Sequence, residues 1–248
     1  MALQAILFDV NGTLIDIETD EGRGRIYRTI SRYLEYLGAE VAPDTLRDRY
    51  FALVAAQLQA SREAFPEFDV VAVWRTLLTE VPAAASGPPP TPEQIRVLPR
   101  FLAQLQRAIS RRRLTLYPDV MRVLEELRPR YALGVVTDAQ TTNAVPELRA
   151  VGLADLLSPI VVSADYGYRK PDPRLFAHAL EALQLRPEQA LYVGNDMYRD
   201  IFGAQQAGLR TVFFSTQYGN KAHDDVTPDA IIDHFAALPD AIARLSRE

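Results

Sequence analysis

The amino-acid sequence predicts an α/β fold in which a doubly wound parallel sheet is interrupted by an inserted all-helical domain. Short apolar runs of strand length recur along the second half of the chain, and segments with helical spacing separate them, which is typical of a parallel sheet. One further run, residues 5–8, precedes a block of about 16–112 that has helical spacing and no convincing strand. We therefore expect a core domain of residues 1–15 and 114–248 and an inserted helical domain of residues 16–113.

The individual elements follow from the spacing of apolar residues and from the residues that end each run. Ala5–Phe8 is unbroken and apolar, which suits a strand buried on both faces of a sheet. Further strands are expected at about 133–137, 160–163, 191–194, 211–214 and 230–232, with helices at about 120–127, 143–151, 173–183 and 201–207 and a last helix that ends near 245. The inserted block is expected to hold helices at about 21–37, 43–58, 69–79 and 92–109, with a loop or extended spacer rich in proline at 82–92. The triplet Arg111-Arg112-Arg113 is expected at a helix end or in a solvated hinge.

Composition excludes several classes of protein. The chain has 248 residues, 48% of them hydrophobic, which is enough for one large domain or two smaller ones. The net charge of -5 is mild, so we expect neither nucleic acid nor an anionic membrane as a partner. The absence of cysteine excludes disulfides, thiolate metal sites and cysteine nucleophiles. No apolar run is long enough to span a membrane and no signal-peptide pattern opens the chain, so a cytoplasmic protein is expected.

Polar side chains follow four of the predicted strands, at the end of each strand where parallel sheets bind their ligands. They are Asp9 and Asn11 after the first strand, Thr137 and Asp138 after the second, Lys170 after the third, and Asn195, Asp196 and Asp200 after the fourth. Several carboxylates, one lysine and one hydroxyl suit a Mg²⁺ ion that faces an anionic oxygen group. A free carboxylate at this edge, such as that of Asp9, can also attack as a nucleophile.

These motifs, in this order, resemble those of the haloacid dehalogenase superfamily, whose members are mostly Mg²⁺-dependent phosphatases. The matching pieces are the segment from Asp9 to Leu14, Thr137, the segment from Lys170 to Pro173, and the segment from Gly194 to Asp200, followed by a helix-like tail from Gly203 to Gly208. The resemblance implies a Rossmann-like core, with the helical block in the place of the family's cap domain. It also implies a hydrolase that acts on a small phosphorylated molecule with Mg²⁺ as cofactor.

Carried over position by position, the resemblance implies a role for each site residue. Asp9 would be the nucleophile that forms an aspartyl-phosphate, and also a metal ligand, while Asn11 would bind the metal through its backbone carbonyl. Thr137 and Lys170, with Asp138 beside them, would bind the phosphoryl group. Asp200, together with Asp196 or Asn195, would complete or orient the metal site, and the sequence leaves open which of the two contacts the metal. Asp138 has an equally good second interpretation, as the cap of the helix that follows its strand.

Asn11 departs from the family pattern and leaves three functions open. The family's phosphatases usually carry a second aspartate here, which protonates the leaving oxygen, and an amide cannot do this. The first function is a phosphatase that is weak or specialised. The second is a 2-haloacid dehalogenase, whose halide product needs no proton, although such enzymes usually carry tyrosine where this chain has Asn11 and Phe176. The third is a scaffold that binds a phosphorylated ligand or a partner without turnover.

Overall fold

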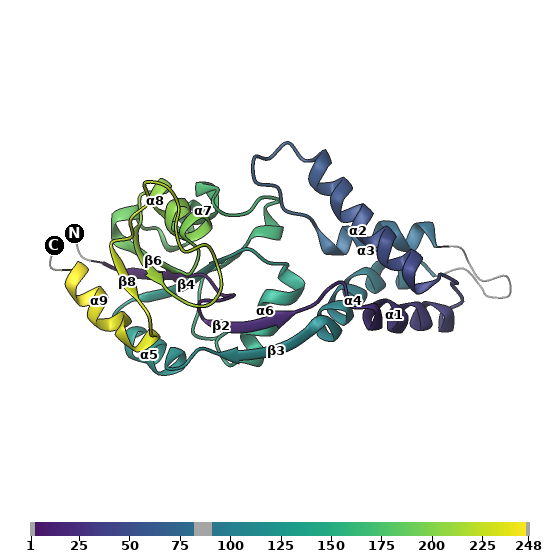
Figure 1. Ribbon diagram of the computed structural model, residues 1–248, viewed down its shortest axis with the longest axis horizontal. Coiled ribbons are helices and arrows are strands. Elements are labelled where there is room, and N and C mark those ends of the chain that lie inside the picture. Colours follow the sequence, from purple (N-terminus) through teal and green to yellow (C-terminus); the bar gives the residue numbers. More distant parts are fainter. Residues whose placement is uncertain (1–2, 82–90, 247–248) are drawn as a thin grey trace. The chain divides into compact units, whose positions relative to one another are not determined.

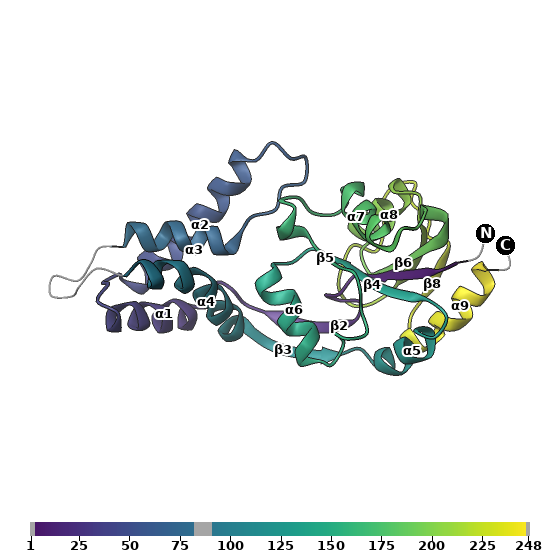
Figure 2. The same cartoon turned by 180° about the vertical axis from the view of Figure 1, so that it is seen from behind.

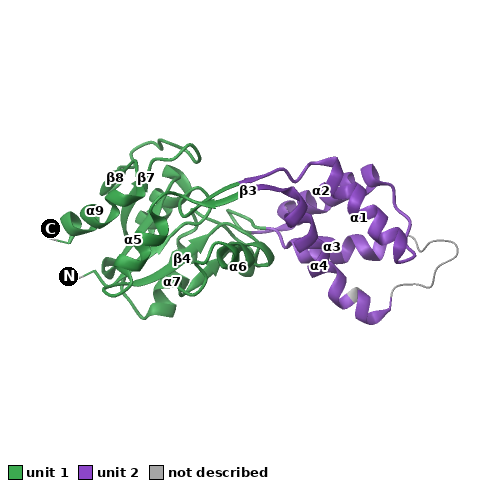
Figure 3. Ribbon diagram, turned by 90° about the horizontal axis from the view of Figure 1, so that it is seen from below, with its two compact units in different colours: residues 1–17, 63–67, 114–248 green, residues 18–62, 68–113 purple. Residues whose placement is uncertain are grey.

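The computed structural model describes residues 3–81 and 91–246, which divide into two compact units (Figure 3). Unit 1 comprises residues 1–17, 63–67 and 114–248, and unit 2 comprises residues 18–62 and 68–113. Most of the spacer expected at 82–92 falls on residues 82–90 and so lies outside the described residues. Among the residues described, no helix is both long enough and apolar enough to cross a membrane.

Unit 1 is built on a parallel six-stranded sheet with the strand order β5-β4-β1-β6-β7-β8 (Figures 1 and 2). Its strands are β1 (Ala5–Phe8), β4 (Ala132–Thr137), β5 (Ile160–Val162), β6 (Ala190–Gly194), β7 (Arg210–Phe214) and β8 (Ala230–Ile232). All five pairings between neighbouring strands are parallel. The order places β1 in the interior of the sheet, between β4 and β6, which explains why its four apolar residues are fully buried.

Helices cover both faces of this sheet. Those of unit 1 are α5 (Val120–Leu127), α6 (Thr141–Ala150), α7 (Pro173–Leu183), α8 (Gly203–Gln206) and α9 (Leu238–Leu245), with short helical turns η1 (Ser163–Asp165), η2 (Pro187–Gln189), η3 (Met197–Phe202, π-helical) and η4 (Phe235–Ala237). Because successive strand residues point to opposite faces, Ile6 and Phe8 share a core with α5 and α9, whereas Ala5 and Leu7 share one with α7 and α8 (Figure 1). The predicted doubly wound α/β fold is therefore confirmed.

Unit 2 is a group of helices packed on an aromatic centre. It contains α1 (Gly24–Tyr36), α2 (Pro43–Ala60), α3 (Val70–Glu80) and α4 (Pro92–Ser110). Trp74 is fully buried, lies 5.4 Å from the ring of Tyr50 and donates a hydrogen bond from its indole nitrogen to Gln106 at 2.9 Å. The helical spacing of apolar residues found in the sequence is therefore the spacing that fills this core.

The expectation that residues 16–112 contain no strand is wrong. Strands β2 (Ile15–Thr19) and β3 (Arg111–Leu116) pair with each other in a separate two-stranded sheet, so the arginine triplet begins a strand. Arg112 lies 2.5 Å from a carboxylate oxygen of Asp20, and Arg113 lies 3.4 Å from one of Glu18. Pairs of opposite charge across strands stabilise a sheet that has little apolar surface, and such strands lack the apolar pattern by which a sequence reveals them.

A short piece of the expected helical insertion, residues 63–67, belongs to unit 1. Pro66 forms an isolated antiparallel bridge with Tyr168, and the backbone N–H of Arg169 donates to the carbonyl oxygen of Phe65 at 2.8 Å. The buried side chain of Glu67 pairs with the guanidinium of Arg169 at 3.1 Å. This segment therefore braces the loop that leads from β5 to Lys170.

Candidate active site

The carboxyl ends of β1, β4 and β6 lie level at one edge of the sheet. Phe8 of β1 is in register with Val135 of β4 and with Val193 of β6. Asp9, which directly follows β1, donates its backbone N–H to the carbonyl oxygen of Val193 at 2.9 Å. The residues that follow these three strands therefore emerge side by side.

Lys170 connects two of the carboxylates at this edge. Its side chain is 3% exposed, and its Nζ lies 2.8 Å from Oδ1 of Asp9 and 2.5 Å from Oδ1 of Asp200. It also donates to the hydroxyl of Tyr192 at 3.1 Å. Burial alone would lower the pKa of Lys170, but the charges of Asp200 and Asp9 outweigh burial and hold that pKa well above its ordinary value. Lys170 is therefore a fixed cation between two carboxylates.

Asp200 is held against the end of β6. Its Oδ2 accepts the backbone N–H groups of Asn195 and Asp196, each at 3.0 Å. A Cβ atom on Gly194 would lie 2.4 Å from Cβ of Asp200, so any other residue at position 194 would displace this carboxylate. Both oxygens of Asp200 thus have protein donors, Oδ1 from Lys170 and Tyr192 and Oδ2 from the backbone.

Asp196 also has both of its oxygens occupied by protein donors. It is the N-cap of η3, where its Oδ1 accepts the N–H groups of Tyr198 and Arg199. Its Oδ2 accepts from the guanidinium of Arg199 and from the backbone N–H of Asn220. Burial alone would raise the pKa of Asp196, but the donors from Arg199 and Asn220 hold it below its ordinary value.

Asn195, rather than Asp196, contacts the loop that carries Asp9. Its Oδ1 accepts the hydroxyl of Thr13 at 3.2 Å, and that hydroxyl lies 3.4 Å from Oδ2 of Asp9. Gly12, at φ +89°, gives room for this contact, because a Cβ atom there would lie 2.5 Å from Nδ2 of Asn195. Asn195 therefore lies next to Thr13, whereas Asp196 caps a helix.

Three polar atoms at the ends of β1 and β4 are buried without a hydrogen-bond partner among residues 3–81 and 91–246. They are Oδ1 of Asn11, Oγ1 of Thr137 and Oδ2 of Asp138. Buried polar atoms are nearly always paired in folded proteins. Three such atoms at a single edge of the sheet indicate a place where a polar ligand can bind.

Asp138 does not cap the helix that follows its strand. The N-cap of α6 is Gln140, whose side chain makes no capping hydrogen bond to the helix. Instead, Oδ1 of Asp138 accepts the backbone N–H of Lys170 at 2.9 Å, and Oδ2 lies 3.9 Å from Nη1 of Arg199. Burial raises the pKa of Asp138, and the nearby charge of Lys170 only partly opposes it.

The site contains residues that the sequence alone did not identify. Tyr192 lies on β6, and its hydroxyl contacts both Lys170 and Asp200. Arg199, which precedes the helix expected at about 201–207, links Asp196 to Asp138. Phe176, where the dehalogenases usually carry tyrosine, is fully buried and packs edge to face on Tyr192 at 4.9 Å.

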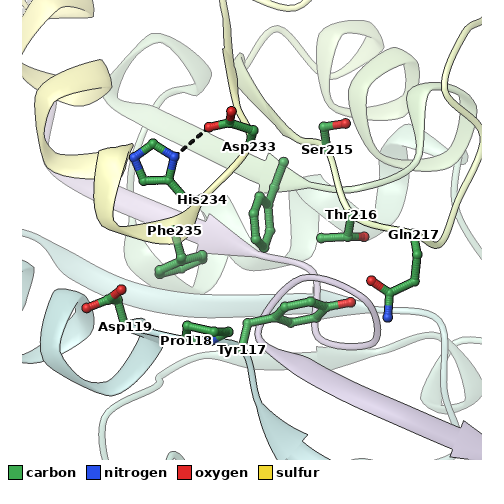
Figure 4. Close-up of a pocket in the computed structure, with 10 residues that line it drawn as sticks. Tyr117, Pro118, Asp119, Ser215, Thr216, Gln217, Asp233, His234 and Phe235 are labelled. Carbon is green, nitrogen blue, oxygen red and sulfur yellow. Dashed lines mark hydrogen bonds and ion pairs between the residues drawn. The ribbon is translucent and has the colours of Figure 1, made fainter.

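A pocket of about 230 Å³ lies outside this group of residues. Its walls come from the segment 117–119 before α5 and from the segments that follow β7 and β8 (Figure 4). Thr216, which lines the pocket, donates to the carbonyl oxygen of Gly12 at 3.0 Å and accepts from Asn195 at 3.4 Å. The pocket thus shares a wall with the loop of Asp9, but Asp9, Thr137 and Lys170 do not line it.

The described residues bring no three acidic, histidine or cysteine side chains together as a metal site. A divalent cation near Asp9 would therefore depend on amide, carbonyl and substrate oxygens in addition to carboxylates. Mg²⁺ is compatible with such a set, since in proteins it often binds to one or two carboxylates and takes its other ligands from water and phosphate.

Comparison with known proteins identifies the family of this chain. Residues 6–214 match the family model of the haloacid dehalogenase-like hydrolases. Among curated relatives, a glyceraldehyde 3-phosphate phosphatase of Methanopyrus kandleri is 34% identical over 136 residues, 53% of this chain and 58% of that protein. A phosphoglycolate phosphatase of Mesorhizobium japonicum is 28% identical over 242 residues, 96% of this chain and 94% of that protein. The chain spans 58% and 49% of the lengths of the first two curated relatives that it matches.

A solved structure extends the likeness to a second activity. A 2-haloacid dehalogenase of Pseudomonas syringae is 26% identical, has a TM-score of 0.70, and aligns over 98% of this chain and 99% of its own. The family model covers the strands that carry Asp9, Thr137 and Gly194, together with the segment that carries Lys170. The chain therefore belongs to the haloacid dehalogenase-like hydrolases.

Proposed function

We propose that this hydrolase is a Mg²⁺-dependent phosphatase of small molecules in which Asp9 attacks phosphorus and carries the phosphoryl group as an aspartyl-phosphate. The observation that carries the proposal is the buried ion pair between Asp9 and Lys170 at 2.8 Å, beside the unpartnered hydroxyl of Thr137. The curated relatives support it, since those reported above are phosphatases.

Lys170 prepares Asp9 for attack. Its ammonium donates a hydrogen bond to Oδ1 at 2.8 Å and so fixes the orientation of the carboxylate that we assign as the nucleophile. The other oxygen, Oδ2, has a longer contact of 3.4 Å with Thr13. Oδ2 is therefore the oxygen that we assign to the attack on phosphorus.

Thr137 would orient the phosphoryl group. Its hydroxyl is buried at the end of β4, next to β1, and lacks a partner among the described residues. A donor that is already in place stabilises the charge of phosphoryl oxygens in the transition state without reorganisation. Thr137 fits this role because it has no competing acceptor.

The oxygen donors near Asp9 fit a magnesium ion. We assign as its ligands the carboxylate of Asp9, the backbone carbonyl of Asn11 and the amide oxygen of Asn195, all of which are hard oxygen donors. Asn195 replaces Asp196 in this assignment because protein donors occupy both oxygens of Asp196. Both oxygens of Asp200 also accept hydrogen bonds from protein donors, so Asp200 would orient Lys170 rather than contact the metal. When bound, Mg²⁺ would offset the negative charge of the phosphoryl group.

Hydrolysis of 4-nitrophenyl phosphate tests this function. We expect the purified protein to hydrolyse it with Mg²⁺ and to lose activity with a chelator. Asp9→Asn should lower kcat by more than about 10³-fold, because the nucleophile is lost. The exposed Asp165, which hydrogen-bonds to Thr141, provides the matched control Asp165→Asn. Full turnover by the Asp9 variant would contradict the assignment of the nucleophile.

A 2-haloacid dehalogenase is the second candidate, and two observations favour it. The amide of Asn11 cannot protonate a leaving group, and a departing halide needs no proton. The dehalogenase of Pseudomonas syringae also aligns with nearly the whole chain. Halide release from 2-chloropropionate without Mg²⁺, with no hydrolysis of aryl phosphate, would establish this candidate. The absence of both activities would favour a scaffold that binds a phosphorylated ligand without turnover.

A further inference from the structure

Hydrolysis of an unactivated phosphate ester needs a proton donor for the leaving oxygen, and Asn11 cannot be that donor. Another carboxyl at this edge of the sheet would have to donate that proton. Asp9 is the proposed nucleophile, and both oxygens of Asp196 and of Asp200 accept protein donors. Asp138 differs from them, because its Oδ2 is buried and has no hydrogen-bond partner among the described residues.

The position of Asp138 follows from the strand order. Asp138 follows β4, Arg199 lies after β6, and β1 runs between these two strands. Neighbouring strands lie about 4.8 Å apart, yet Nη1 of Arg199 comes within 3.9 Å of Oδ2 of Asp138. The two side chains therefore reach toward each other across the end of β1, where Asp9 and Asn11 leave the sheet.

Lys170 binds both carboxyls, Asp138 through its backbone N–H and Asp9 through its side chain. Its backbone N–H donates to Oδ1 of Asp138 at 2.9 Å, while its ammonium donates to Oδ1 of Asp9 at 2.8 Å. Each carboxyl thus has one oxygen held by Lys170, whereas its second oxygen has a longer polar contact, with Thr13 at 3.4 Å for Asp9 and with Arg199 at 3.9 Å for Asp138.

The surroundings of Asp138 favour a carboxyl that keeps its proton to a higher pH than usual. Burial raises its pKa most, and the negative charge of Asp200 acts in the same direction. The charges of Lys170 and Arg199 and the backbone N–H of Lys170 oppose this rise without cancelling it. A proton donor is most effective when its pKa approaches the working pH.

We propose that Asp138 is the proton donor and acceptor of the reaction, in the place of the acid that Asn11 cannot supply; this inference rests on the proposed phosphatase function. In the first step Asp9 forms a bond to phosphorus, the ester P–O bond breaks, and the carboxyl of Asp138 gives its proton to the leaving oxygen. In the second step the Asp138 carboxylate takes a proton from water, whose oxygen attacks phosphorus. The bond to Asp9 then breaks, which releases phosphate and restores both carboxyls.

The test compares two aryl phosphates whose leaving phenolates differ in basicity. Nitrophenolate leaves without a proton, whereas phenolate benefits from one, so Asp138→Asn should affect phenyl phosphate far more than 4-nitrophenyl phosphate. The asparagine retains an acceptor for the N–H of Lys170. For phenyl phosphate we expect the rate of the first step to fall by about 10²–10⁴-fold. With 4-nitrophenyl phosphate the variant should give a stoichiometric burst of nitrophenolate and then slow turnover, because water lacks its base.

Three further variants complete the test. The double variant Asn11→Asp with Asp138→Asn should regain hydrolysis of phenyl phosphate, because it carries an acid at the other position. Asp165→Asn should behave as the wild type. If Asp138→Asn does not fold, Asp138→Ala replaces it. We expect this variant also to affect phenyl phosphate far more than 4-nitrophenyl phosphate.

The results of these assays distinguish a wrong role for Asp138 from a wrong phosphatase function. Equal loss on the two substrates, no loss, or the absence of a burst would overturn the role of Asp138 and leave the phosphatase function standing. A wild type that hydrolyses neither substrate would overturn both.

Discussion

Replacing Lys170 with methionine should destabilise unit 1 by an amount that depends on pH. Methionine keeps the length and the apolar stem of lysine but leaves Asp9 and Asp200, whose side chains are 8% and 2% exposed, without their cation. Removal of one partner from a buried ion pair typically costs about 3–5 kcal/mol. For a chain of this length, that corresponds to a fall in Tm of roughly 6–20 °C.

The sign of the pH effect follows from how the pKa values differ between the folded and the unfolded protein. The pKa of Lys170 is raised in the folded protein, so its stabilisation is complete below its unfolded pKa and is lost only as pH rises through its folded pKa. The contribution of Lys170 is therefore fully present at both pH 5 and pH 8. Burial already raises the pKa of Asp200, and the charge of Lys170 opposes that rise; in the variant this opposition is lost, so Asp200 takes up a proton as pH falls, which relieves its cost. The loss of stability should thus be larger at pH 8 than at pH 5, by about 1 kcal/mol or more.

Thermal and urea unfolding, followed by circular dichroism, measure this difference. The sequence has only two lysines, and Lys221→Met is the matched control because Lys221 is exposed. We expect the control to change Tm by little at either pH. The same deficit for Lys170→Met at both pH values, or a deficit below about 1 kcal/mol, would refute the reasoning about the buried pair.

Three other predictions concern residues at the end of β6. Gly194→Ala should shift Asp200, lower the free energy of unfolding by about 1–3 kcal/mol and reduce phosphatase activity. Gly22→Ala should do neither, because a Cβ atom there would lie at an ordinary contact distance of 3.8 Å from Oδ1 of Asp20. An active and fully stable alanine variant at 194 would contradict the contact. Asp196→Ala should cost about 1–2 kcal/mol in urea unfolding at pH 7 through loss of the N-cap. Because the pKa of Asp196 is lowered on folding, its contribution is present above the unfolded pKa and is lost as pH falls through the folded pKa, so the deficit should shrink near pH 3. Asn195→Ala should weaken Mg²⁺ binding in calorimetric titration, and Asp196→Asn should leave it unchanged; the reverse result would restore Asp196 as the ligand.

The sequence predicted which polar residues follow the strands of the sheet. Ala5–Phe8 is apolar throughout and is followed by Asp9, and the parallel sheet rule alone then predicts where Asp9 lies. Thr137 and Gly194 likewise end predicted strands, and in the structure these are β4 and β6, the two strands that flank β1. The rule could not predict β2 and β3, because their pairing depends on charges brought together from positions about 95 residues apart.

The sequence by itself determined the fold class, the order of the polar motifs and the absence of an acid at position 11, because these depend on residue type and on local periodicity. Only the tertiary structure decided which partner each of these polar residues contacts. Asn195 meets Thr13 while Asp196 turns to the N–H groups of η3, because the chain changes direction between β6 and that helix. Asp138 bonds to Lys170 instead of capping α6 for the same kind of reason. Hydrogen bonds are directional and short, so which of two adjacent side chains reaches a partner depends on the exact path of the backbone, which spacing along the sequence does not contain.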